Sequence, residues 1–430
     1  MLIIIVGCNY LISGKNVLFP SVIVSGVFCI STFLMVLNMN YWQYEVSINT
    51  VIIICFAVVL FSFGSLLGSK VMIVQPNRKK QQLFGKDCFN IDISSFNMNW
   101  ISLMCLTVTF AYAYHQYRLA ASLGNNAGIL GVIGTIRSQV LINPDIFQLG
   151  TLMNIGIAFT RAVGYICLFN TIVGFIYRDR DIKKYIIPIV CLVFNIILGT
   201  GRSSLITMTV ACLFDIYIVQ RKRSVHKFNK KMIKYIVIGV VVFFIVFWFV
   251  GTLTGKSGIL SLWDTISIYA GSSILCLDSF LKNPNPSSTV FGVKTFVGLY
   301  NLLNKIGFSF PKGSNHAEFV FWQGGKYSSN IYTSLFPYIQ DFSIAGAIIL
   351  QFFLGFLFGM VWKKYLSDYA RPMLLITYGR FWGAPLAFYS IAEVLITSNI
   401  ALNTFVEIFF YIIIIKTVFK KKKCYVESKT

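Results

Sequence analysis

Long apolar stretches, separated by short segments rich in Lys and Arg, dominate the chain. A helix of roughly 17 to 25 apolar residues crosses a hydrocarbon core of about 30 Å. Transmembrane strands would alternate over about ten residues, and these stretches do not alternate. The pattern therefore predicts an all-α, polytopic integral membrane protein. We expect about eleven transmembrane helices, over residues 1–13, 17–37, 50–69, 99–119, 147–177, 185–199, 203–220, 233–254, 342–362, 373–396 and 398–419.

The distribution of basic residues predicts the orientation of these spans. Five basic clusters begin at Arg78, Arg178, Arg221, Lys363 and Lys420. Lys and Arg are enriched in cytoplasmic loops, and the proposed spans place all five clusters on one side of the membrane. The N-terminus is thus expected outside and the C-terminus inside.

One membrane domain over residues 1–430 is expected, with two long outer loops over residues 120–146 and 255–341. The second loop, between spans eight and nine, is too long for a simple turn. Its first part, LSLWDTISIYAGSSILCLDSFL, has apolar residues at helical spacing, which predicts helices at the outer interface. The rest is rich in Gly, Asn and Pro and is typical of loops.

Composition narrows the class of protein further. Only 12% of the residues are charged, against about a quarter in soluble domains. The formal charge of +22 lies in clusters between apolar stretches, so it does not predict nucleic-acid binding. No HExxH, P-loop or GxGxxG motif is present, and we expect neither a metal nor another cofactor.

Arg202 in the segment ILGTGRSSL lies where the chain turns back into the membrane from outside. Span seven therefore begins with its positive end outward, with Ser203 and free backbone N–H groups beside the guanidinium. An Arg fork matches phosphate oxygens better than Lys does, which predicts an anion site. The alternative is an Arg that anchors the helix at the interface or contacts lipid headgroups.

Arg161 falls near the middle of span five, without a charged neighbour within one helical turn. A charge at this depth costs roughly 2.5 to 3.5 kcal/mol unless it faces a cavity or a partner. It either lines a substrate path or pairs with a buried carboxylate, such as Glu407 or Glu393. Arg380, nearer the cytoplasmic end of its span, is expected to be structural.

The large outer loop holds candidate groups for acid–base chemistry. His316 lies two residues before Glu318 in KGSNHAEFVF, and Asp341 precedes span nine. Any of these three side chains could take a proton from an attacking hydroxyl. A purely local structural role is the alternative for each of them.

Three pieces of the chain resemble bacterial O-antigen and capsule repeat-unit polymerases, the Wzy family. They are LGTGRSSLI, then YAGSSILCLDSFL followed by STVFGVKTFVGLYNLL, and SNIYTSLFPYIQDFSIAGAIIL, in this order. The resemblance implies a multi-pass enzyme of the bacterial inner membrane, similar to C-type glycosyltransferases, with its N-terminus periplasmic and its C-terminus cytoplasmic.

The implied reaction transfers a growing glycan from undecaprenyl pyrophosphate onto the next undecaprenyl-pyrophosphate-linked repeat unit, at the periplasmic face and without a metal. Arg202 matches the outer Arg of this family, and Asn330 to Asp341 match its segment before span nine. Arg202, Arg161 and Arg137 are the candidates to hold the pyrophosphate. Asn330 lies in the matched segment, and Tyr332 could stack on a sugar face.

The resemblance also implies partners of the same pathway, a chain-length regulator and a flippase, besides the lipid-linked oligosaccharide and the bilayer. Two other functions remain open from the sequence. An O-antigen ligase would use the same donor with a lipid A core acceptor. A lipid-linked oligosaccharide flippase would need charges along a path through the membrane, and Arg161 is compatible with that.

Overall fold

The computed structural model describes residues 1–71, 91–92, 95–124, 128–142, 149–177, 181–199, 201, 203–223, 261–284, 290–311, 317–367, 370–417 and 420–421. This part of the chain is mainly helical. It forms two compact units, each built from segments that are distant in the sequence. The first comprises residues 1–78, 261–370 and 381–402, and the second comprises residues 79–260, 371–380 and 403–430.

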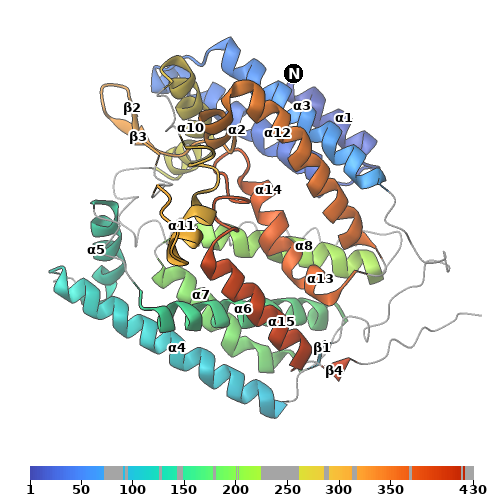
Figure 1. Cartoon of the computed structure of the whole chain (residues 1–430), viewed down its shortest axis with the longest axis vertical. Coiled ribbons are helices and arrows are strands. Elements are labelled where there is room, and N and C mark those ends of the chain that lie inside the picture. Colours follow the sequence, from blue (N-terminus) through green and yellow to red (C-terminus); the bar gives the residue numbers. More distant parts are fainter. Residues whose placement is uncertain are drawn as a thin grey trace, which may run out of the picture. The chain divides into compact units, whose positions relative to one another are not determined.

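The first unit contains three N-terminal helices, a short hairpin and helices from the second half of the chain. These are α1 (Leu2–Ile12), α2 (Pro20–Trp42), α3 (Ile48–Lys70), α10 (Leu262–Lys282), α11 (Val297–Lys305), β2 (Val320–Trp322), β3 (Tyr327–Ser329), α12 (Leu335–Leu366) and α14 (Ala384–Phe388). In Figure 1 the blue helices α1 to α3 lie beside the orange helix α12.

The second unit is built around α6. It contains α4 (Ser95–Ser122), α5 (Gly128–Ile142), α6 (Thr151–Tyr177), the 3₁₀ turn η3 (Asp181–Tyr185), α7 (Ile186–Leu198), α8 (Ser203–Arg223), α13 (Pro372–Tyr378), α15 (Leu402–Thr417) and a two-residue pairing of β1 (Ile91–Asp92) with β4 (Lys420–Lys421). Helices α4, α7 and α8 pack against α6 (Figure 1).

Five of the described helices are long and apolar enough to cross a membrane: Pro20–Trp42, Ile48–Lys70, Thr151–Tyr177, Ser203–Lys222 and Leu335–Leu366. These correspond to spans two, three, five, seven and nine of the sequence analysis. Together with the composition, they indicate a helical membrane protein. The span expected over residues 233–254 lies outside the described residues. The count of eleven and the sidedness stay predictions.

Glycines bring α3 and α12 into backbone contact. A Cβ on Gly64 or Gly68 would lie 2.1 or 2.0 Å from a carbonyl oxygen of α12. On Gly355 and Gly359 it would lie 2.1 Å from a carbonyl oxygen of α3. Small residues at four-residue spacing permit such close approach in membrane proteins, because dispersion contacts replace the hydrophobic effect there.

Span ten differs from its prediction. A continuous helix was expected over residues 373–396, but α13 passes into a π turn at Gly379–Gly383 and α14 ends at Phe388. Pro385 is consistent with the π turn, since it has no N–H for the helical bond to the carbonyl of Phe381. The helix then ends three residues later, at Phe388.

The two segments expected to be outer loops also contain more helix than the sequence predicts. Helix α5 occupies much of the segment at residues 120–146, and α12 begins seven residues before the expected start of span nine. Inside α12, Ser343 has φ 64° and ψ 173°, which kinks the helix at that expected start. The helical prediction for the first part of the large loop is confirmed by α10, which begins with a capping box between Ser261 and Asp264.

Candidate functional site

Arg161 lies in the apolar helix α6 without a counter-ion among the described residues. Its side chain is partly exposed. Glu407, considered from the sequence as its partner, instead binds Arg380 through two contacts of 3.3 Å. An Arg in a transmembrane helix is costly unless a partner or water compensates it. Arg161 is therefore available to an external anion, whereas Arg380 is structural, as expected.

Helix α4 supplies a hydroxyl group beside Arg161. Tyr112 is buried, and its ring lies within electrostatic range of the guanidinium. Its hydroxyl oxygen lies 3.8 Å from the position that a Cβ on Gly199 would take. Gly199 ends α7 and opens the GTGRSS turn, and its N–H donates to the carbonyl of Asn195 at 3.1 Å. Arg161 is thus linked through Tyr112 to the turn that the sequence singles out.

Two buried amides belong to the same part of the second unit. Gln116, one turn after Tyr112, lies beside the Tyr112 hydroxyl without hydrogen-bond geometry, and its two amide atoms have no partner. Asn195, one turn before Gly199, is 2% exposed, and its amide atoms are also unpartnered. Buried amides normally form hydrogen bonds, so unpartnered amide atoms are candidate contacts for a bound molecule. The helices that carry them, α4 and α7, pack directly against each other.

This group of one guanidinium, one hydroxyl and two amides, which we term the Arg161 cluster, can supply several hydrogen bonds to a phosphate group. Ser203 begins α8 and is exposed, and its carbonyl accepts from the Thr207 hydroxyl at 3.0 Å. Arg202 lies outside the described residues. Arg137 is part of α5, but its side chain also lies outside them.

The candidate bases belong to the first unit. His316 lies outside the described residues. Glu318 is exposed, and its carboxylate forms no hydrogen bond with the described residues. Its backbone carbonyl accepts from the Tyr332 hydroxyl at 3.2 Å. Among the described residues, therefore, no hydrogen-bond partner positions the Glu318 carboxylate.

Asn330 and Tyr332 follow directly after the β2–β3 hairpin. The Tyr332 ring packs on Phe336 with 4.2 Å between the centroids. Burial, followed by the nearby Cys276 and Glu318, raises the pKa of Tyr332, which keeps its hydroxyl a donor. Asn330 is partly exposed, directly after β3.

Asp341 has a structural role in the first unit. Its carboxylate accepts from the backbone N–H of Lys294 at 3.1 Å and of Thr295 at 2.6 Å. These bonds tie the segment before α11 to the first turns of α12. The carboxylate of Asp341 is therefore engaged in a contact that holds the fold of the first unit.

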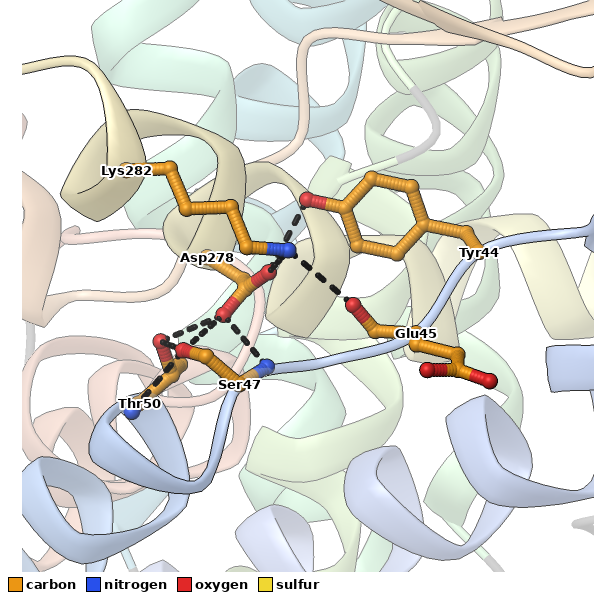
Figure 2. Close-up of polar contacts among 6 residues, drawn as sticks. All are labelled: Tyr44, Glu45, Ser47, Thr50, Asp278 and Lys282. Carbon is orange, nitrogen blue, oxygen red and sulfur yellow. Dashed lines mark hydrogen bonds and ion pairs between the residues drawn. The ribbon is translucent and has the colours of Figure 1, made fainter.

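The sequence analysis missed a buried carboxylate, Asp278 of α10 (Figure 2). Its Oδ1 accepts from the Ser47 amide at 2.9 Å, the Ser47 hydroxyl at 2.5 Å and the Thr50 hydroxyl at 2.6 Å. Its Oδ2 accepts from the Tyr44 hydroxyl at 2.9 Å and from Lys282 Nζ at 2.7 Å. These five residues form what we term the Asp278 cluster.

The Asp278 cluster fastens α10 to the start of α3. Burial alone raises the pKa of Asp278, but the hydrogen bonds from Lys282, Ser47 and Thr50 together hold it below its ordinary value. Lys282 also donates to the carbonyl of Glu45 at 3.0 Å and lies over the Tyr44 ring. Because protein donors fill both oxygens, the cluster is structural. The sequence shows an acidic residue on an apolar helix, which predicts that its carboxylate is hydrogen-bonded. It does not identify the donors.

In the described part of the chain, no group of three or more His, Cys, Asp or Glu residues is placed to hold a metal ion. Comparison of the chain with protein-family models, with curated proteins and with solved structures finds no match.

Proposed function

We propose that this chain is a repeat-unit polymerase: a membrane glycosyltransferase that moves a growing glycan from undecaprenyl pyrophosphate onto a new undecaprenyl-pyrophosphate-linked unit. The reaction would take place at the periplasmic face of a bacterial inner membrane, during O-antigen or capsule synthesis. The observation that carries the proposal is Arg161 in the apolar helix α6, a cation without a counter-ion among the described residues, with unpartnered amides near the GTGRSS turn.

The chemistry of the leaving group explains why such a cluster suits this reaction. As the glycosidic bond breaks, negative charge grows on the pyrophosphate, and preorganised donors in a poorly hydrated place stabilise it most. In this proposal Arg161 binds one phosphate, with Tyr112, Gln116 and Asn195 as neutral donors around it. Arg202 and Ser203 at the start of α8 would extend the site.

The acceptor hydroxyl needs a base, and the candidates differ in their surroundings. Asp341 already accepts two backbone N–H groups, whereas the Glu318 carboxylate has no partner among the described residues. Glu318 is therefore the better candidate of these two carboxylates, with His316 as the alternative.

The proposal is tested with purified protein in lipid nanodiscs on a defined undecaprenyl-pyrophosphate-linked repeat unit. Removing one preorganised donor to a developing anion typically costs about 10²- to 10³-fold in kcat. We expect a loss of this size for Arg161→Ala and partial activity for Arg161→Lys. Arg118→Ala is the matched control, because Arg118 is exposed on α4 and its side chain donates to the Tyr114 hydroxyl at 3.4 Å, its one hydrogen bond within the described part of the chain. Undiminished polymer from Arg161→Ala would refute the role of Arg161.

A flippase for lipid-linked oligosaccharides is a second candidate, because a cation in a span also suits a path for phosphate through the membrane. The same nanodisc assay separates the two functions. A polymerase lengthens the glycan and releases undecaprenyl pyrophosphate, whereas a flippase does neither. In cells, deletion of a polymerase leaves lipopolysaccharide with a single repeat unit, and deletion of a ligase leaves bare core.

A further inference from the structure

Asp215 is the one acidic residue in the sequence of α8, a helix long and apolar enough to cross a membrane. The residue is 1% exposed. Its Oδ1 is buried and accepts no hydrogen bond. No Lys or Arg among the described residues forms an ion pair with it. A carboxyl group is therefore held in an apolar part of the second unit without compensation for a negative charge.

The titratable groups around Asp215 do not supply that compensation. On α8 itself, the Cys212 thiol lies one turn away, within electrostatic range. From α15, Tyr411 lies within electrostatic range of both Asp215 and Glu407. Tyr378 of α13 packs on the adjacent Phe214, with 5.2 Å between the centroids. None of these groups carries a positive charge.

Two cations of the second unit need to be considered. Lys222, seven residues further along α8, is 9% exposed and forms no ion pair with Asp215, and Arg380 is already engaged. Arg380 binds Glu407 through two contacts of 3.3 Å, and it also lies over the Tyr165 ring of α6. Tyr165 in turn lies within electrostatic range of Cys212. Glu407, at 1% exposure, is as deeply buried as Asp215. One of the two buried carboxyl groups thus has a cation and the other has none.

For a buried carboxyl group without a cation, such as Asp215, the charged form costs far more free energy than the neutral form. An unpaired carboxylate in an apolar medium is so unfavourable that the group takes up a proton instead. A neutral carboxyl group with an unmade hydrogen bond costs only about 1 to 3 kcal/mol. Ionisable residues within membrane spans also mark proton sites and pathways.

We propose that Asp215 is a proton-binding site within the membrane, occupied at neutral pH and in exchange with water. Binding converts the carboxylate and one proton from water into a neutral carboxylic acid, with no change of oxidation state. Glu407 is paired with Arg380 and is not part of this site. This proposal does not depend on the enzymatic activity proposed above.

Infrared spectroscopy of the full-length protein in lipid nanodiscs at pH 7 tests the proposal. Protein with ¹³C-labelled Asp carboxyl groups identifies the carbonyl band of a protonated Asp. We expect such a band in the wild type, shifted by the label and by transfer to D₂O, and absent in Asp215→Asn. Asp264→Asn is the control and should retain it, because the Asp264 side chain is engaged in the capping box of α10.

Three results would overturn the proposal. The first is the absence of a protonated-Asp band at pH 7, and the second is a band that persists in Asp215→Asn. The third is a band that disappears in Asp215→Asn but does not shift in D₂O, which would mean a locked structural proton. Because Asn has the shape of a protonated Asp, this variant should fold, and its elution as a monodisperse peak verifies that.

Discussion

The contact between α3 and α12 makes Gly355→Ala a sharp test of the fold of the first unit. A Cβ on Gly355 would lie 2.1 Å from the carbonyl oxygen of Phe61, and ordinary contacts of a Cβ begin at 3.4 Å. The atom in the way belongs to the backbone of α3, so no side chain can rotate aside. The two helices would have to separate by about 1.3 Å at this point.

The size of the effect follows from two opposing contributions. Overpacking an interface typically costs about 1 to 3 kcal/mol, and a rigid backbone obstacle places Gly355→Ala at the upper end. Ala favours a helix over Gly by about 1 kcal/mol, which offsets part of that cost. We therefore expect the variant to lower the free energy of unfolding by about 2 kcal/mol.

Thermal unfolding in one detergent, followed by the loss of the monodisperse chromatographic peak, measures this difference. Gly26→Ala is the matched control, because a Cβ on Gly26 of α2 would meet nothing within 4 Å. We expect Gly26→Ala to be neutral or stabilising and Gly355→Ala to unfold at a clearly lower temperature. Equal unfolding temperatures for the two variants would refute the close contact of α3 with α12.

Two further predictions concern buried carboxylates outside the Arg161 cluster. Because the folded protein holds the pKa of Asp278 below its ordinary value, Asp278 stabilises the fold above the unfolded pKa, near 3.8, and this contribution is lost as the pH falls through the folded pKa. Unfolding temperatures measured from pH 7 downward should thus depend less on acidic pH in Asp278→Asn than in the wild type, and parallel curves would contradict this. Glu407→Gln leaves Arg380 buried without its counter-ion, which should destabilise the protein by about 3 to 5 kcal/mol in detergent unfolding. The double variant Arg380→Met with Glu407→Gln should be less destabilised than Glu407→Gln alone, and an additive loss would argue against the pair.

The sequence predicts those helices that are marked by their own apolar length or helical spacing. α2, α3, α6 and α8 follow from the length of their apolar stretches, and α10 follows from its helical spacing. The structure adds the capping groups at their starts, Pro20 in the first turn of α2 and the Ser47 side chain before α3.

Hydropathy and residue spacing along the chain do not predict the partners of the charged residues. The sequence left open whether Arg161 pairs with Glu407, and the structure assigns Glu407 to Arg380. Four of the five donor groups on Asp278 come from residues 228 to 234 positions earlier in the chain. Such choices depend on which helices pack together, and that is a property of long-range contacts.

The sequence by itself therefore determined a helical membrane protein and the positions of most of its long apolar helices, because hydrocarbon thickness and apolar length are directly related. Only the tertiary structure decided where charge is compensated. It joined Arg380 to Glu407, enclosed Asp278 among five donor groups, and left Arg161 and Asp215 without a counter-ion among the described residues. The physical reason is that a buried charge is stabilised by neighbours in space, which periodicity along the chain does not specify.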